Sequence, residues 1–437
     1  MTISLELQEW SEKTATEQAS PLAGVFLKDA ETRVLAQQLT TAGMLEIREL
    51  REGLSIASTS YVGRITLGDL VITVQPKISG MPLVLVRLLH YAYGLRDLHL
   101  SSMTGFQTEQ WAFQEILIAQ LVEEASELVA RGLHRRYRRI DDDLASPRGR
   151  IDLQQIAQRG GVIEATIPCT YYPRLEDCLV NQVLLQGLYL AARLTGESKL
   201  RVHLFRLVSI LQESVSSIRL DVHTLKRLHR EMDRLTSAYR PAITIIELLL
   251  AGEGASLADE RQRMRLPGFL FDMNRFFQAL LSRFLKEQLT EYEVRDQYQI
   301  KGMMTYDPAY NPRRQRAPTP RPDYLVVQHG QVVSILDAKY RDLWERDLPA
   351  HWLYQLAIYA LSRQQEKIAV ILYPTTNEVA REARIVLSEP VFGAGQATVV
   401  LRPVNLLDLE KLVTGAMTAR YERERRAFAE KLVLGEA

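Results

Sequence analysis

Apolar and polar residues alternate along residues 54–78, on both sides of a turn at Leu67-Gly68-Asp69. This alternation predicts a hairpin of two strands, each with one buried face. Residues 81–93 form an almost wholly apolar segment, and residues 108–130 carry apolar positions at mixed spacing. Both segments favour helices, so the first part of the chain is predicted to mix strands and helices.

Residues 177–250 are predicted to be helical almost throughout, with an apolar stripe that includes Val180, Leu184 and Leu188. Breaks follow at Gly252, Gly254 and Pro267, after which residues 269–289 predict an amphipathic helix. A loop rich in proline and arginine, residues 306–322, precedes the final elements. These are two strands, a helix at residues 352–363, and strands at residues 368–374, 381–387 and 397–404.

These patterns predict a multidomain fold that combines α+β and α/β parts. We expect a mixed N-terminal domain over residues 1–144, a helical middle region over 145–252, and a domain with a central mixed sheet over 253–437. A length of 437 residues agrees with two or three domains. The arginine-rich segment 131–152 is interpreted as a connector. The arginines at 131–139 are interpreted as a solvated face paired with the aspartates at 141–143, and contact with DNA or a partner is the alternative.

Charge and cysteine content narrow the functional classes. Lysine and arginine total 54 against 53 acidic residues, a net charge of +1, which excludes a globally basic nucleic-acid coat and makes any DNA contact local. Two cysteines, Cys169 and Cys178, exclude a disulfide scaffold or a four-cysteine zinc module and are predicted to be unpaired buried thiols. No segment is typical of a secretory signal or a membrane span, so we expect a cytoplasmic protein without a membrane partner.

Candidate chemistry lies in the last domain, where Asp323 precedes one predicted strand and Asp337-Ala338-Lys339 ends the next. Two carboxylates at one sheet edge can hold Mg²⁺ through oxygen, and the ion can activate water and neutralise a phosphodiester oxyanion. Lys339 can supply a fixed positive charge or orient the attacking water, and alternation places it on the same face as Asp337. Because an Asp-x-Lys sequence also occurs by chance, it does not establish this chemistry alone.

The register of this hairpin decides whether the two aspartates meet. With a two-residue turn at His329 and Gly330 and regular pairing, Asp323 lies opposite Leu336, and Asp337 faces the other side of the sheet. A three-residue loop or one β-bulge places Asp323 directly across from Asp337. The chemistry therefore predicts the longer loop or a bulge.

Two further groups of side chains lie near this edge. Gln355 and Tyr359 are four residues apart in the following helix and therefore share a face that can reach the metal edge; a role in packing alone is the alternative. A local basic patch precedes the first aspartate and can hold backbone phosphates near the ion; it consists of Arg313, Arg314, Arg316 and Arg321.

These residues carry a resemblance to a known family. Arg321-Pro322-Asp323, Asp337-Ala338-Lys339-Tyr340 and Gln355-x-x-x-Tyr359 resemble the PD-(D/E)xK nuclease motif in its RecB-like form. More closely, the chain resembles the McrC family of McrBC-type restriction systems, which cleave modified DNA. Four other segments carry this likeness along nearly the whole chain: YVGRITLGDLVITVQPKI, RGRIDLQQI, CTYYPRLEDCLVNQVL and FDMNRFF.

For the C-terminal domain, the resemblance implies a restriction-endonuclease-like fold that cuts double-stranded DNA with Mg²⁺, for which Mn²⁺ can substitute. Asp323 and Asp337 would be the metal ligands and Lys339 the catalytic lysine, with support from Gln355 and Tyr359. The sequence departs from the family at one point. Many such nucleases carry a further glutamate on the first helix of the domain, where this chain has Gln278, which puts a third metal carboxylate in doubt.

The resemblance also implies a partner, a hexameric AAA+ GTPase of McrB type. The N-terminal domain would dock into its ring near Pro76 and Lys77 and stimulate nucleotide hydrolysis, although Pro76-Lys77 can also simply end a strand. The chain has no G-x-x-x-x-G-K-[ST] loop of its own, as expected if the motor is a separate protein. Two alternatives stay open at this stage: a stand-alone RecB-like or CRISPR-type exonuclease, and a catalytically idle adaptor that activates an AAA+ NTPase.

Overall fold

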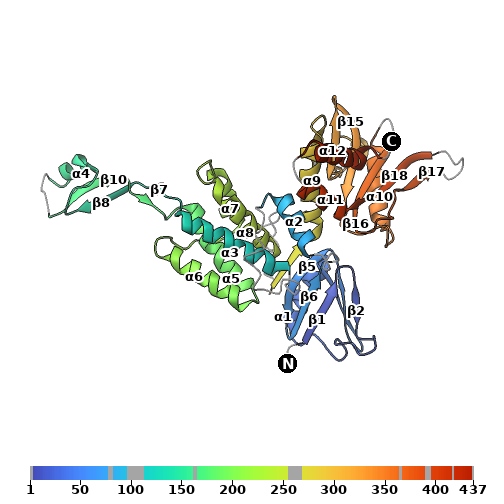
Figure 1. The fold of residues 1–437 in the computed structure, drawn as a ribbon, viewed down its shortest axis with the longest axis horizontal. Coiled ribbons are helices and arrows are strands. Elements are labelled where there is room, and N and C mark those ends of the chain that lie inside the picture. Colours follow the sequence, from blue (N-terminus) through green and yellow to red (C-terminus); the bar gives the residue numbers. More distant parts are fainter. Residues whose placement is uncertain are drawn as a thin grey trace.

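The computed structural model describes residues 3–76, 82–95, 113–160, 165–253, 268–363, 367–388, 395–415 and 418–435. They form a mixed α+β structure with several separate sheets. Figure 1 shows an elongated molecule, with a strand-containing arm at one end, a helical bundle in the middle, and the N- and C-terminal units together at the other end. Among these residues, no helix is long and apolar enough to cross a membrane.

The N-terminal unit consists of residues 3–76 together with β12 (Gly268–Asp272), and in this described part it contains two sheets and one helix, α1 (Ala30–Thr41). The predicted hairpin is confirmed for residues 61–75, where Leu67 pairs with Leu70 around a turn in which Gly68 has a φ of +60°. Residues 54–58, which were expected in the same hairpin, belong instead to a strand of the second sheet. Alternate residues such as Ile65 and Ile72 are fully buried, which accounts for the pattern in the sequence. The first sheet has the order β1 (Ile3–Gln8), β6 (Leu70–Gln75), β5 (Tyr61–Leu67), β12 (Gly268–Asp272), and the second β2 (Glu12–Thr14), β4 (Gly53–Ser58), β3 (Leu45–Leu50).

Strand β12 corrects one prediction. The helix expected from residue 269 begins only at Met273, as α9 (Met273–Gln288), and the apolar residues before it pair with β5. Gly268 has a φ of +147°, and a Cβ there would lie 2.3 Å from the Arg64 carbonyl oxygen, so the strand enters the sheet through a position that only glycine fits. Asp272 then caps α9 by accepting a hydrogen bond from the Asn274 amide. The division predicted at residue 252 stays a prediction.

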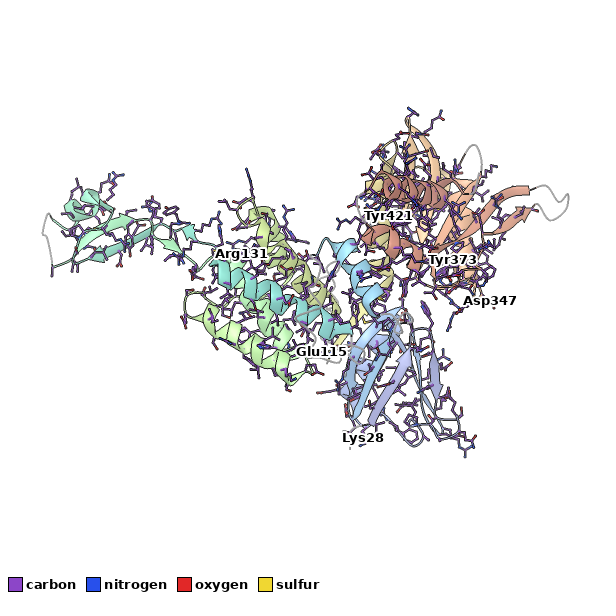
Figure 2. The ribbon with its side chains drawn as sticks, in the orientation of Figure 1. Lys28, Glu115, Arg131, Asp347, Tyr373 and Tyr421 are labelled. Atoms are coloured by element: carbon purple, nitrogen blue, oxygen red, sulfur yellow. The ribbon has the colours of Figure 1, made fainter. Side chains whose placement is uncertain are left out.

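The middle of the chain is helical, as predicted for residues 177–250. Its helices are α3 (Phe113–Arg131), α5 (Leu179–Leu194), α6 (Ser198–Gln212), α7 (Val222–Glu231) and α8 (Arg240–Gly252). Leu184 and Leu188 are fully buried, as the apolar stripe implied. Glu115 and Arg131 mark opposite ends of α3, with Glu115 near the N-terminal unit (Figure 2). The predicted start of this helix near residue 108 lies outside the described residues; α2 (Pro82–Tyr93) is the predicted apolar helix before it.

The segment interpreted as a connector is a folded arm, so that interpretation was wrong. Its strands are short and polar and lack the apolar alternation that reveals a strand in sequence. Arg139 does pair with Asp141, but Arg135 and Arg136 pair with Glu176 and Glu231. The elements are β7 (Arg136–Tyr137), β8 (Ile140–Leu144), β9 (Arg150–Ile151), α4 (Leu153–Gln158), β10 (Ile167–Tyr171) and β11 (Arg174–Leu175).

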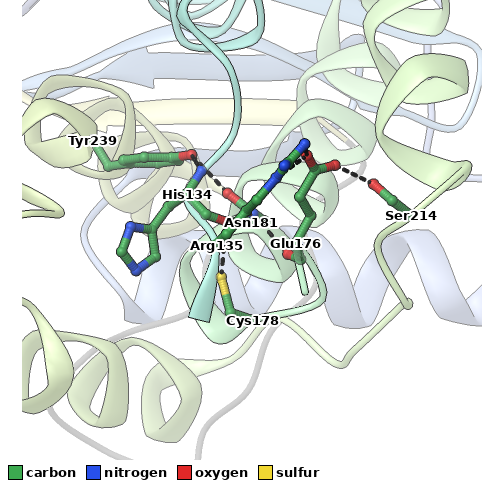
Figure 3. A network of polar contacts seen from close by, with 7 residues as sticks. All are labelled: His134, Arg135, Glu176, Cys178, Asn181, Ser214 and Tyr239. Atoms are coloured by element: carbon green, nitrogen blue, oxygen red, sulfur yellow. Dashed lines mark hydrogen bonds and ion pairs between the residues drawn. The ribbon is translucent and has the colours of Figure 1, made fainter. Parts of the chain in front are cut away.

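A polar network joins the root of the arm to the helical bundle (Figure 3). The buried Asn181 amide donates hydrogen bonds to the main-chain oxygens of His134 and Glu176, at 2.8 and 2.7 Å. Tyr239 donates to Asn181 Oδ1 at 2.7 Å and accepts from the His134 amide at 2.8 Å. Glu176 also binds Arg135 and Ser214. As predicted, both cysteines are buried and free, with the Cys178 thiol 3.6 Å from the His134 oxygen.

The C-terminal unit, from α9 to α12 (Ala419–Leu434), contains the predicted mixed sheet. The order is β13 (Glu293–Asp296), β14 (Tyr324–Gln328), β15 (Gln331–Ala338), β16 (Ile368–Thr375), β18 (Gly395–Asn405), β17 (Ala383–Ser388). Strands β15, β16 and β18 are parallel, and the other pairs are antiparallel. Helix α10 (Ala350–Leu361) contacts β15, β16 and β18. Helix α9 contacts β13 and β15, α12 contacts β15, and α11 (Leu406–Thr414) contacts β18. The sequence did not predict edge strand β13.

Candidate active site

A β-bulge sets the register of the hairpin between β14 and β15, as the chemistry predicted. His329 and Gly330 form a two-residue turn, with φ values of 50° and 79°. The pairs Gln328–Gln331 and Val327–Val332 follow directly, and the register then shifts by one residue, so that Val326 pairs with Ser334 and Tyr324 with Leu336. Continued past Tyr324, this register brings Asp323 opposite Asp337.

Alternation along the two strands identifies the face on which these residues lie. Leu325 and Ile335 belong to the apolar cluster that includes Leu356 and Tyr359 of α10. Leu336 and Ala338 belong to the cluster that includes α9 residues. Because side chains alternate along a strand, Asp323 and Asp337 project on the α10 side of the sheet, at its edge.

The two aspartates are close together and almost completely buried, with 6% of Asp323 and 1% of Asp337 exposed. Asp323 Oδ2 accepts a hydrogen bond from the Ala338 amide at 2.8 Å, which ties it to the chain between Asp337 and Lys339. Burial raises the pKa of Asp323. Burial and the charge of Asp323 together raise the pKa of Asp337 to about 7. Two buried carboxylates that repel each other are what a cation would stabilise.

Among the described residues, Lys339 supplies the only ammonium group that contacts Asp337. Its Nζ atom lies 3.0 Å from Asp337 Oδ2 and 5.7 Å from the centre of the Trp352 ring on α10. The backbone amide of Lys339 donates to the Leu372 oxygen at 3.0 Å, so strand β16 holds the base of the side chain. Trp352 was not among the predicted residues, although it lies three residues before Gln355, on the same face of the helix.

Gln355 and Tyr359 share one face of α10, as their spacing predicted, and the Tyr359 hydroxyl lies within range of the charges of Asp323 and Asp337. Gln355 Nε2 donates to Tyr359 Oη at 2.7 Å. Tyr359 is buried, which raises the pKa of its hydroxyl, and the charges of Asp337 and Asp323 add to this increase. The structure therefore brings together Asp323, Asp337, Lys339, Gln355 and Tyr359.

The predicted basic patch lies on the loop that leads into the site. Arg321 is exposed, and its Nε donates to the Gln297 oxygen at 2.8 Å, beside Asp323. Arg313, Arg314 and Arg316 are exposed further along the loop, and Arg314 has a φ of 49°. Among the four arginines, only Arg321 is tied to the residues around Asp323 by a hydrogen bond that the structure shows.

Two amides hold Asp323 from the other side. Gln278 Nε2 on α9 donates to Asp323 Oδ1 at 3.0 Å, so the residue at the position expected to carry a glutamate does lie at the site. Gln297 Nε2 donates to the same oxygen at 2.5 Å, and its backbone amide donates to the Asp323 carbonyl at 2.8 Å. No pattern in the sequence pointed to Gln297, because it follows the unpredicted strand β13. A cleft of about 610 Å³ opens here, lined by residues that include Arg275, Gln278, Lys286, Gln297 and Asp323.

The donor set fits a hard cation with few protein ligands. Among the described residues, no group of three or more histidine, cysteine, aspartate or glutamate side chains could hold a metal ion. Mg²⁺ is commonly held by only one or two carboxylates, with waters and substrate phosphates as its other ligands. Asp323 and Asp337 meet that requirement, because they offer two carboxyl groups beside the single ammonium group of Lys339.

Comparison with known proteins now identifies the family. The sequence model of one protein family, the McrBC 5-methylcytosine restriction system component, matches residues 56–374. This range includes both aspartates, Lys339, Gln355 and Tyr359. The chain belongs to this McrBC family. No match to a curated protein was found.

One solved structure shares the fold of this McrBC family member along almost its full length. A refined half-complex from the tetradecameric assembly of Thermococcus gammatolerans McrB AAA+ hexamers with bound McrC contains a chain with 20% sequence identity and a TM-score of 0.63. The match covers 98% of this chain and 100% of that one, so it shows a common fold along almost the full length. A chain in the cryo-EM structure of the T. gammatolerans McrBC complex has 18% identity and a TM-score of 0.47, over 66% of this chain and 89% of that chain.

The two residues predicted to dock the partner are only partly described. Pro76 is buried directly after β6, and Lys77 lies outside the described residues. Neither is near the aspartates in sequence, and their predicted role in docking stays a prediction.

A substitution at Gln278 tests the effect of a third carboxylate beside Asp323. We expect Gln278→Glu to lower the free energy of unfolding of the metal-free protein by about 1–3 kcal/mol, because a hydrogen bond to a buried carboxylate is replaced by repulsion. Thermal unfolding in EDTA measures this loss, and added Mg²⁺ should restore more stability than it adds to the wild type. The variant Gln278→Glu/Asp323→Asn is the control, since it lacks the repelling pair. Equal unfolding midpoints for Gln278→Glu and the wild type in EDTA would contradict the prediction.

Proposed function

We propose that this chain is the McrC-type cleavage subunit of a restriction complex. Its C-terminal unit would be a Mg²⁺-dependent endodeoxyribonuclease of the PD-(D/E)xK type that hydrolyses phosphodiester bonds of modified double-stranded DNA. The observation that carries this proposal is the bulge that brings Asp323 toward Asp337 and Lys339 at one buried edge. Buried acidic groups with raised pKa values beside a cleft are typical of functional sites, because they cost stability without improving packing.

The residues around this edge have separable roles in the proposed reaction. Bound Mg²⁺, held by Asp323 and Asp337, would supply an activated water and neutralise negative charge on the phosphate. Lys339 would place a fixed positive charge beside the reacting phosphate, within a site shielded from water. Gln278 and Gln297 orient the Asp323 carboxylate, and Gln355 orients the Tyr359 hydroxyl.

We further propose that the subunit acts in the cytoplasm with a hexameric AAA+ GTPase of McrB type. The N-terminal domain, residues 1–144, would dock on that partner near Pro76 and Lys77 and stimulate nucleotide hydrolysis, and residues 253–437 would form the nuclease domain. Support comes from the family match and from the fold shared with a chain in an assembly of McrB AAA+ hexamers with bound McrC.

Coexpression with an AAA+ GTPase of McrB type from the same organism provides the direct test. The purified complex is incubated with methylated or unmethylated DNA, with Mg²⁺ or EDTA, and with GTP, ATP or no nucleotide. We expect double-strand cleavage of methylated DNA that requires both Mg²⁺ and a nucleoside triphosphate. Trimming of DNA ends without nucleotide would instead indicate a stand-alone exonuclease, and nucleotide hydrolysis without any cleavage would indicate an adaptor.

The arginine loop should contribute affinity for DNA without selecting its sequence. Replacing Arg313, Arg314 and Arg316 by glutamine should weaken DNA binding and make it less dependent on salt. The slope of log binding constant against log salt concentration should become shallower by about 0.9 for each phosphate that the loop no longer binds, because each bound phosphate releases a condensed counterion. Binding isotherms at several salt concentrations measure both quantities. The matched control is glutamine at Arg420, Arg423 and Arg426, which removes the same charge from exposed positions of α12. Equal slopes for the two triple variants would show that the loop does not bind DNA.

A further inference from the structure

The residue that follows Lys339 is held by the N-terminal unit. Tyr340 is only 4% exposed, although it lies one peptide bond from the proposed catalytic lysine. Its hydroxyl donates a hydrogen bond to Glu9 Oε1 at 3.2 Å, a contact between residues 331 positions apart. Its ring packs edge-on against Phe277 of α9, with ring centres 6.0 Å apart. The end of the Asp-x-Lys segment is thus anchored outside its own sheet.

Glu9 and Trp10 form a matched pair of contacts with Tyr340 and Arg341. Glu9 directly follows β1, is 2% exposed, and its backbone amide donates to the Gln75 oxygen at 3.0 Å, so the N-terminal sheet fixes its position. The Arg341 guanidinium lies 5.3 Å from the centre of the Trp10 ring. Trp10 has a φ of 58°, a strained conformation for a bulky residue. Two consecutive residues of one unit therefore contact two consecutive residues of the other.

A second connection reaches the backbone of Tyr340. Its amide donates to Asn274 Oδ1 at 3.1 Å, and Asn274 Nδ2 donates to Ser60 Oγ, between β4 and β5, at 2.5 Å. The Met273 amide also donates to the Ser60 oxygen at 3.0 Å. Both the side chain and the main chain of Tyr340 are thereby connected to the N-terminal sheets.

The partner of the Tyr340 hydroxyl is a carboxylate that is itself 2% exposed. A buried tyrosine hydroxyl can be satisfied by a main-chain oxygen, as Tyr324 is by the Gln278 oxygen at 2.6 Å. A buried carboxylate is a costlier partner, because its charge must be removed from water. A contact that costs stability and lies next to a proposed catalytic group is consistent with a role in function.

We propose that Tyr340, anchored by Glu9 of the N-terminal unit, is a positioning residue that holds Lys339 in register with Asp337. This inference rests on the proposed nuclease function. Its physical basis is that Lys339 and Tyr340 share a peptide unit, so displacement of the tyrosine moves the base of the lysine side chain. Cleavage thereby depends on how the N-terminal unit is seated on the C-terminal unit.

The test compares variants that each remove or weaken one hydrogen bond of a tyrosine hydroxyl. Tyr340→Phe keeps the ring and removes the hydroxyl, whereas Glu9→Gln keeps an acceptor oxygen and weakens the bond by removing the charge. Tyr61→Phe is the control, because it also removes a hydrogen bond from a tyrosine hydroxyl to a carboxylate, from Tyr61 Oη to Asp272 Oδ2 at 3.3 Å, but one that lies between the paired strands β5 and β12 and does not touch Tyr340. Single-turnover cleavage by the complete complex is measured over a range of DNA concentrations, alongside thermal unfolding.

We expect Tyr340→Phe to lower the rate at saturating DNA by roughly 10- to 100-fold, the scale of effect produced by a displacement near 1 Å. The half-saturating DNA concentration should stay within about twofold of the wild type, because the proposed DNA-binding residues are unchanged. Glu9→Gln should lower the same rate by a smaller factor, and Glu9→Gln/Tyr340→Phe should be no slower than Tyr340→Phe, because both changes act on one interaction. Tyr61→Phe should cleave like the wild type.

Each other outcome has a distinct meaning. If Tyr340→Phe cleaves as Tyr61→Phe does, or if its defect appears in DNA affinity rather than in the saturated rate, the positioning role is wrong while the nuclease proposal stands. The same holds if the effects of Glu9→Gln and Tyr340→Phe multiply. If the wild-type complex does not cleave, or if Asp337→Asn cleaves as fast as the wild type, the nuclease proposal fails and the positioning role fails with it.

Discussion

Replacing Asp337 by asparagine should abolish DNA cleavage, with a loss of roughly 1000-fold or more, and leave the protein folded. Asparagine has nearly the same shape, but it removes one of the two negative charges that would hold Mg²⁺. Asp337 is 1% exposed, and no other carboxylate among the described residues groups with the pair to replace it. Nicking of supercoiled methylated DNA by the purified complex, with Mg²⁺ and nucleotide, measures the loss.

Stability separates a chemical role of Asp337 from a structural one. The wild-type carboxylate is desolvated and repelled by Asp323, so its removal should not lower the thermal midpoint measured in EDTA. Mg²⁺ should raise the midpoint of the wild type and not that of Asp337→Asn, since only the wild type gains binding free energy on adding the ion. Nucleotide hydrolysis by the complex should persist. Cleavage at the wild-type rate would leave the adaptor as the better description of the chain.

Asp342→Asn is the matched control for this variant. Asp342 is also a buried aspartate of the C-terminal unit, 8% exposed, and it accepts hydrogen bonds from Thr375 Oγ1 at 3.1 Å and from the Trp344 amide at 3.0 Å. Its substitution should cost stability, because asparagine satisfies those donors less well, and should leave the cleavage rate near that of the wild type. The two variants should therefore show opposite patterns of stability and activity.

The geometry of the hairpin at the site was predictable because chemistry constrained it. A turn at His329 and Gly330 was visible in the sequence, but with regular pairing it would have separated Asp323 from Asp337. The requirement that the carboxylates meet led to the expected bulge, which the structure places between Val326 and Val327. Here a hypothesis about function predicted a detail of the backbone that periodicity alone could not supply.

Other features were missed for identifiable physical reasons. The residues of β12 are apolar and lead directly into a helix, and a short apolar run does not reveal whether it is strand or helix. The arm strands β7 and β9 have two residues each, too few for alternation to be seen. Gln297 and Glu9 reach the site region through contacts that span 26 and 331 residues, which no local pattern encodes.

Replacing Lys339 by methionine should lower the saturated cleavage rate by about 100- to 1000-fold, the usual scale for removing one fixed charge that stabilises a transition state. Methionine keeps most of the apolar stem that lies near Trp352 but has no ammonium group to place beside Asp337. Lys411→Met is the control, since Lys411 also forms an ion pair in the same unit, with Asp408 at 3.2 Å, on the exposed surface of α11.

The response to Mg²⁺ distinguishes this defect from that of Asp337→Asn. Lys339→Met retains both carboxylates and removes a competing cation, so Mg²⁺ should still raise its thermal midpoint, by at least as much as in the wild type. Lys339→Arg should not restore full activity, because a planar guanidinium cannot occupy the position of a compact ammonium between Asp337 and Trp352. If Lys339→Met abolished both cleavage and stabilisation by Mg²⁺, Lys339 would organise the metal site and would not act on the phosphate.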